Sequence, residues 1–198
     1  MLLQWVARTL QGDLFFDIPP EDASWNSAWN LFWNDAATRD RYNKKLPFQV
    51  YACWNGLAVF GAGPLLGLPP PLPPSPLASG GGDAPSSGGN GNKQKAVGFR
   101  SPKKGECYSG EPTLFCKDLW RAGYGRIAVV PSVNLEYSDE AAKKIKDLKG
   151  YTSWWWTEPG EDREDRSIIQ WVEQPPETVK CVPTWEDQSW RPWNESLS

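Results

Sequence analysis

The residues best suited to chemistry lie between Gly105 and Arg126, where acidic and basic side chains crowd a short span. Two carboxylates, Glu106 and Glu111, stand five positions apart in a stretch that leads into a predicted helix. A carboxylate in such a loop can be directed into a cleft, where it can move a proton or stabilise a developing positive charge. For Glu111 a structural role is the alternative, because a negative charge stabilises the N-terminus of a helix.

A helix over residues 112–123 is predicted to position the other candidates. Pro112 suits the first helical turn, and Gly123 suits a left-handed C-terminal cap. Lys117, Asp118 and Arg121 share one arc of the helical wheel, so this face is the one that can do chemistry, although Arg121 also suits a surface cation near the helix end. The opposite arc is predicted to be core and holds Phe115, Cys116, Leu119, Trp120 and Ala122.

Apolar patterns predict the remaining elements. Residues 22–41 have tryptophans and other apolar residues at intervals of three and four, which predicts a helix with a core-facing stripe. Residues 48–53 and 57–60 predict a hairpin around Trp54-Asn55-Gly56, because Asn-Gly favours tight turns. Residues 97–100 and the apolar run 127–130, which follows Arg126 and is expected to be buried, predict further strands of the same sheet. Residues 139–149 predict another helix with a solvated lysine face.

Residues 64–92 differ sharply in composition from their surroundings. Their proline-rich half favours polyproline II structure, and their glycine- and serine-rich half favours flexible coil. Neither half can bury enough apolar surface to offset the entropy of ordering. The sequence therefore predicts a disordered insert within a single domain of 198 residues.

Composition narrows the classes of function. The net charge is −3 and no dense basic stripe occurs, which disfavours nucleic-acid binding. The chain has no histidine, which excludes histidine general bases and most zinc sites. The four cysteines show no C-x-x-C spacing, and either two disulfides or four thiols fit them. No apolar tract reaches the length of a membrane span, and the first residues do not resemble a signal peptide.

Several motifs resemble the fungal capsule-associated α-1,3-mannosyltransferase family. They are WVAR at residues 5–8, CWNG at 53–56, GEC at 105–107 and CKDLWRAGYGRIAVVPSV at 116–133. The resemblance implies an α/β fold that corresponds to the C-terminal part of a GT-A-like glycosyltransferase domain, a mixed sheet flanked by helices. It also implies a luminal location at the Golgi or another secretory-pathway membrane, with the family's anchor and acidic motifs outside this chain.

The chemistry that the resemblance implies is transfer of mannose from GDP-mannose to the 3-hydroxyl of a mannoside, with retention at the anomeric carbon. Glu106 and Glu111 are then the catalytic candidates, because a carboxylate can stabilise an oxocarbenium-like transition state. The candidates for substrate binding are Trp54, Asn55, Lys117, Asp118, Arg121 and Arg126. Glu106, Glu111 and the Trp54-Asn55 turn are expected to converge on one cleft at a sheet edge.

The sequence departs from the family pattern in two ways. Pro112 stands where the family tends to have a cysteine, which affects any inherited disulfide pattern. No D-x-D motif occurs, so the divalent metal that the resemblance implies, Mn or Mg, has no identifiable ligands in this chain. The alternative function is a truncated, non-catalytic domain that binds carbohydrate or another partner.

Overall fold

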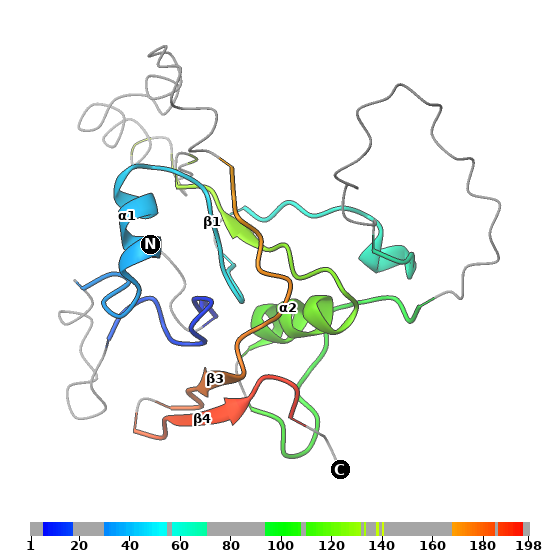
Figure 1. Cartoon of the computed structure of the whole chain (residues 1–198). Helices are drawn as coiled ribbons and strands as arrows, with labels where there is room; N and C mark the ends of the chain where they lie inside the picture. Colours follow the sequence, from blue (N-terminus) through cyan, green and yellow to red (C-terminus); the bar gives the residue numbers. More distant parts are fainter. Residues whose placement is uncertain are drawn as a thin grey trace, which may run out of the picture.

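The computed structural model describes residues 6–17, 30–54, 57–70, 94–107, 110–131, 133, 138, 140, 168–184 and 186–195. In these residues the chain is a mixed α/β protein with short helices and two small antiparallel sheets (Figure 1). In chain order the elements are α1 (Ala36–Asn43), β1 (Phe48–Gln49), the 3-10 helix η3 (Pro64–Leu66), α2 (Glu111–Arg121), β2 (Ala128–Val129), β3 (Thr178–Cys181) and β4 (Ser189–Pro192).

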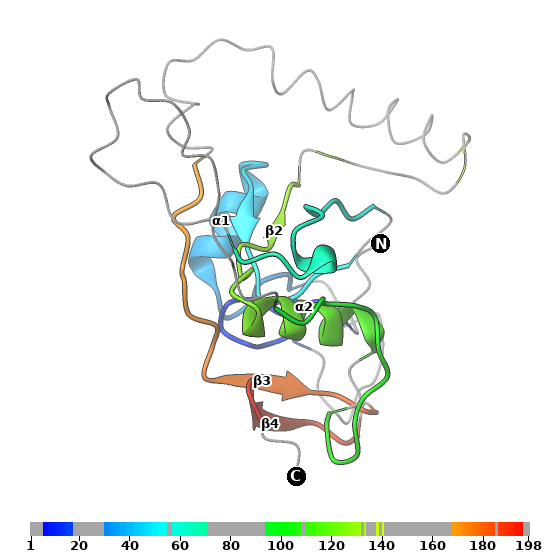
Figure 2. The same cartoon turned by 90° about the vertical axis from the view of Figure 1, so that its right-hand side faces the viewer.

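Helix α2 lies between the two sheets. Both views place the β1–β2 pair on one side of α2 and the β3–β4 hairpin on the other (Figure 2). Phe48 of β1 pairs with Val129 of β2, and the hairpin pairs Cys181 with Ser189. On its buried side α2 is held to the segment after β1, because the indole Nε1–H of Trp120 donates to the carbonyl of Tyr51 at 2.9 Å.

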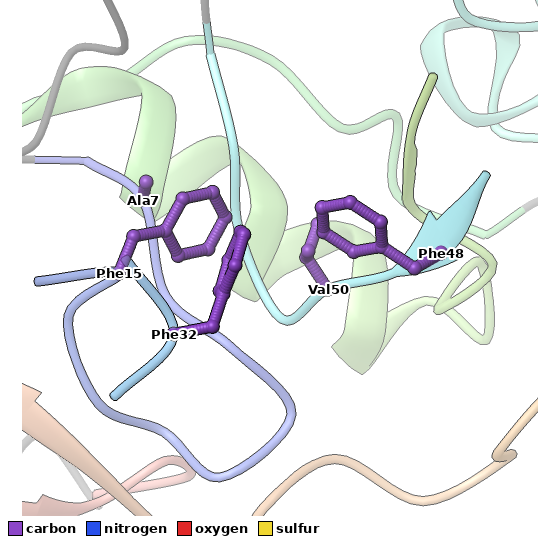
Figure 3. Packing of buried hydrophobic residues seen from close by; sticks show 5 residues of the cluster. All are labelled: Ala7, Phe15, Phe32, Phe48 and Val50. Atoms are coloured by element: carbon purple, nitrogen blue, oxygen red, sulfur yellow. The ribbon is translucent and has the colours of Figure 1, made fainter. Parts of the chain in front are cut away.

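The aromatic core on the β1 side is built from distant parts of the sequence. Phe32 packs against Phe15 and Phe48 with ring centroids 4.8 and 5.2 Å apart, and Ala7 and Val50 complete the cluster (Figure 3). Such edge and tilted ring contacts add to the stabilisation that comes from burial alone. This core fixes the path of the chain into β1.

Arg8, from the WVAR motif, is a buried cation that links the N-terminal segment to β3. Its backbone exchanges hydrogen bonds with Ala52, and its Nε–H donates to the carbonyl of Lys180 at 2.8 Å. Burial lowers the pKa of Arg8 to about 10, and the charge of Asp13 opposes this shift. The guanidinium is therefore still charged at neutral pH.

The predicted helix over residues 22–41 is confirmed from Ala36 onward and is wrong for residues 30–35. Residues 31–34 form a turn, and α1 begins only at Ala36, where the side chain of Asp35 caps it by accepting from the amide of Thr38. Phe32 adopts a φ of 55°, which breaks any helix at that residue. The tryptophans at 25 and 29 lie outside the described residues.

The predicted single sheet is also wrong. β1 pairs with β2, not with residues 57–60, which form no strand, and residues 97–100 form none either. The run 127–130 contributes β2 but alternates between half-buried and exposed residues, so it is not the buried strand that was expected. The predicted helix over 139–149 lies outside the described residues, apart from Glu140.

The first part of the predicted insert is packed, in contrast to the disorder expected from residue 64 onward. Pro64 is buried in η3, and its carbonyl accepts from the amide of Val97 at 2.9 Å. The hydroxyl of Tyr124 donates to the carbonyl of Leu68 at 2.8 Å. Residues 71–92 lie outside the described residues. In the described parts of the chain no helix is long and apolar enough to cross a membrane.

Candidate functional site

The local sequence sets the ends of α2 as predicted. Gly110, with a φ of 78°, precedes the helix, Pro112 lies in its first turn, and Gly123 has a left-handed φ of 82° just after its end. The apolar arc faces inward. The polar arc does not all face solvent, however, because Lys117 is only 6 % exposed. Lys117 therefore lies on the predicted polar arc but is buried.

Lys117 is buried because it belongs to a network of ion pairs around Glu106. The Glu106 side chain is 0 % exposed. Its carboxylate oxygens accept from the Arg100 guanidinium at 2.6 and 3.0 Å and from the Lys117 ammonium at 2.8 Å. The backbone amide of Lys103 also donates to it, at 3.0 Å. We call this network, together with Asp118 and Glu195, the Glu106 cluster.

The Glu106 cluster ties three parts of the chain together. Arg100 also donates to Asp118 of α2, at 3.1 Å from Nη2 to Oδ1. Glu195, which follows β4, accepts from the Lys117 ammonium at 3.3 Å and from the Cys107 amide at 3.1 Å. A disulfide between Cys107 and Cys181 joins the same loop to β3. The loop of the GEC motif is therefore held both covalently and electrostatically.

The electrostatics keep Glu106 ionised. Burial on its own would raise the pKa of Glu106, but hydrogen bonds from Arg100 and Lys117 outweigh it and hold the pKa well below its usual range. Hydrogen bonds to Glu106 and Asp118 in turn raise the pKa of Arg100. A carboxylate offers about four acceptor positions, and four donors already occupy those of Glu106. This geometry indicates that Glu106 holds its neighbouring side chains in position.

Glu111 is placed differently. It is exposed at the first turn of α2, and its side chain makes no hydrogen bond or ion pair within the described part of the chain. Arg121, at the other end of the helix, lies 3.6 Å from Asp118 and donates to the Glu195 carbonyl at 3.4 Å. The two candidates are thus at opposite ends of α2, about 15 Å apart along its axis.

Trp54 and Arg126 line an open apolar cleft beside α2. Trp54 makes edge contacts with Phe99 and Phe115, at 5.5 and 6.3 Å between ring centroids, and Arg126 is paired with Glu173 at 3.0 Å. Asn55 lies outside the described residues. Neither glutamate lines this cleft, and the expected convergence of Trp54 and Asn55 with Glu106 and Glu111 stays a prediction.

Sequence reasoning missed Arg100 and Glu195 as members of the Glu106 cluster. Arg100 is the last residue of a segment predicted to be a strand, and Glu195 lies in an Asn-x-Ser glycosylation sequon, so neither showed a helical or motif spacing to Glu106. The sequence did contain one signal for such partners. A lysine among the apolar residues of a helix needs a buried carboxylate from elsewhere in the chain, because an unpaired buried charge is costly.

The remaining two cysteines are thiols. Burial raises the pKa of Cys116 to about 11, and burial together with the nearby Cys116 raises that of Cys53 to about 12. Both are therefore protonated at neutral pH, which makes them poor nucleophiles and metal ligands. The pairing left open by the sequence is thus one disulfide and two free thiols.

A divalent metal does not fit the described residues. No group of three or more aspartate, glutamate, cysteine or histidine side chains gathers within the described ranges. The carboxylates of Glu106, Asp118 and Glu195 are each paired with a cation of the chain itself.

Comparison with known proteins identifies the family. The family model described as cryptococcal mannosyltransferase 1 matches residues 3–118. An α-1,3-mannosyltransferase of Cryptococcus neoformans var. neoformans serotype D is 35% identical over 207 residues, which cover 96% of this chain and 38% of that relative. No solved structure matches the chain. Because the family model spans more than half of the sequence, the chain belongs to the cryptococcal mannosyltransferase 1 family.

Proposed function

We propose that this chain forms part of an enzyme that transfers mannose from GDP-mannose to a mannoside acceptor, with an α-1,3 linkage in the product. The observation that carries the proposal is the 35% identity, across 96% of the chain, to a protein named as an α-1,3-mannosyltransferase. The matched region is 38% of that relative, so the complete activity is proposed for a full-length family member.

The positions of the two glutamates divide their proposed roles. Glu106 is surrounded by its own donors, so we assign it to holding Lys117 and Arg100 in place and not to contact with the sugar. Glu111 is the carboxylate with an accessible side chain, and we propose it as the group that stabilises positive charge at the anomeric carbon. Arg121 then contacts a more distant part of the substrates, because α2 separates it from Glu111 by about 15 Å.

The Glu111→Gln substitution tests this assignment. In the full-length Cryptococcus relative, at the aligned position, and in this chain, mannose transfer is measured with a panel of nucleotide sugars, and the linkage is determined by NMR of the product. We expect transfer in the full-length variant to fall by a factor of about 100 or more, with the melting temperature nearly unchanged. The matched control is Glu177→Gln, which alters another exposed glutamate.

Two results would count against the proposal in different ways. If transfer survives and stability falls by about 0.3–1 kcal/mol, Glu111 is only a favourable charge at a helix N-terminus. If the wild-type full-length relative transfers no mannose from any donor in the panel, the proposed reaction itself is wrong.

Three further properties are proposed for the full-length protein. A GT-A-like topology is proposed for the complete domain, consistent with the mixed α/β content. A luminal location in the secretory pathway is proposed, and the Cys107–Cys181 disulfide supports it because such bonds persist in oxidising compartments. A divalent metal, Mn or Mg, is proposed for the full-length enzyme with ligands outside the described residues, and loss of transfer on chelation tests it.

A further inference from the structure

The apolar cleft beside α2 is large and its walls are unusually exposed. It encloses about 880 Å³. It is lined by the side of α2 that carries Phe115 and Leu119 and by residues of two other segments, which are 57–61, 63, 64, 68 and 69 in the first and 124, 126–130 and 133 in the second. The lining residue Val59 is 86 % exposed, and Leu57 and Val133 are also well exposed. Single exposed apolar residues are common on proteins, but a continuous patch of them marks an interaction surface.

The chemistry of the lining does not suit a sugar. Among the described residues of the cleft only Arg126 is charged, and it is already paired with Glu173 at 3.0 Å. The Tyr124 hydroxyl donates its hydrogen to the carbonyl of Leu68. A carbohydrate site needs several convergent donors and acceptors that fix the ligand's orientation. This cleft instead presents aliphatic and aromatic side chains, as one face of a protein core does.

We propose that an apolar face of the remaining polypeptide covers this cleft in a full-length family member, so that the cleft is half of an internal domain core. The length of the relative supports this occupant, because the matched region is only 38% of it and leaves ample chain to cover the surface. The inference rests on family membership and not on the proposed transfer reaction. It predicts that residues such as Val59 are exposed in this chain and buried in the longer protein.

The test compares one substitution in two contexts. Val59→Asp is made in this 198-residue chain, and aspartate is placed at the aligned position of the full-length Cryptococcus relative. The matched control is Leu66→Asp, because Leu66 is 64 % exposed in η3 but does not line the cleft. Melting temperature and resistance to trypsin are measured for all four variants and their parents.

We expect Val59→Asp and Leu66→Asp to shift the melting temperature of this chain by similarly small amounts. In the full-length relative, the aspartate aligned with Val59 should lower the melting temperature by several degrees or prevent folding, because a buried unpaired charge is costly. The control should remain folded there. The proposal would be overturned if, in the full-length relative, the variants with aspartate aligned to Val59 and to Leu66 were equally stable.

Two other outcomes would also overturn it. If Val59→Asp destabilises this chain as strongly as it destabilises the full-length relative, residues of this chain already cover the cleft. If sedimentation shows that this chain is a dimer and that Val59→Asp dissociates it, a second copy is the occupant. Neither outcome changes the result of the mannose-transfer assay on the wild-type full-length relative. A failure of this proposal is therefore distinguishable from a failure of the proposed function.

Discussion

Replacing Glu106 by glutamine tests whether the buried ion pairs stabilise the fold. The substitution keeps the shape of the side chain and removes its charge. Lys117 would keep Glu195 at 3.3 Å, and Arg100 would keep Asp118 at 3.1 Å. Removal of one partner from a buried ion pair costs about 3–5 kcal/mol when the other charge is left uncompensated. Since both cations retain a second acceptor, we expect the lower end, about 3 kcal/mol.

The assay is urea unfolding followed by tryptophan fluorescence, with Glu173→Gln as the matched control. The ion pair of Glu173 with Arg126 is 3.0 Å long, but the Glu173 side chain is 65% exposed. An exposed pair contributes little, so the control should cost less than about 1 kcal/mol. Both variants replace a glutamate by glutamine, so the difference between their losses of unfolding free energy isolates the effect of burial. Equal losses of stability in the two variants would refute the reasoning.

Three other measurements probe the same framework. Because the pKa of Glu106 is lowered in the folded protein, the unfolded chain binds this proton first as the pH falls. The contribution of Glu106 to the free energy of unfolding is therefore complete above about pH 4.3 and declines below it. Glu106→Gln should make stability depend less on pH in that acidic range, as measured by urea unfolding at a series of pH values. Removing the disulfide with a Cys107→Ser, Cys181→Ser double variant should cost about 4 kcal/mol in urea unfolding, because the bond closes a separation of 74 positions. Gly125→Ala should lower the stability measured by thermal unfolding by about 1–3 kcal/mol, because the new Cβ would lie 2.1 Å from a buried tryptophan ring. The control Gly98→Ala, whose Cβ would have no atom within 4 Å, should change stability by less than about 0.5 kcal/mol.

Local signals in the sequence predicted α2 well. Pro112 and Gly123 act through backbone sterics that need no tertiary context, and the structure places them within and just after the helix as expected. The same approach failed at residues 31–34, which form a turn within the predicted helix over residues 22–41. Phe32 has a left-handed backbone there because the ring packs between Phe15, Tyr42 and Phe48, and periodicity along one segment does not contain that information.

The candidate site shows the same division between local and distant information. A helical wheel placed Lys117 on the polar face, but its partners Glu106 and Glu195 come from a loop and from the far end of the described chain. Likewise, β1 pairs with β2, about eighty positions away, in place of the neighbouring segment after the Asn-Gly turn. Glu106, Lys117 and Asp118 were candidates from the sequence, whereas their pairing with Arg100 and Glu195 depends on the tertiary fold.

The Cys107–Cys181 bond has a practical consequence for fragments of this protein. It encloses α2, β2 and β3 in one covalent loop. A single proteolytic nick anywhere in that loop therefore leaves both pieces linked, so nicked and intact molecules have the same mass apart from one water. They separate only after reduction. A nicked preparation would keep the Cys107 loop joined to β3, and reducing gels are needed to recognise it.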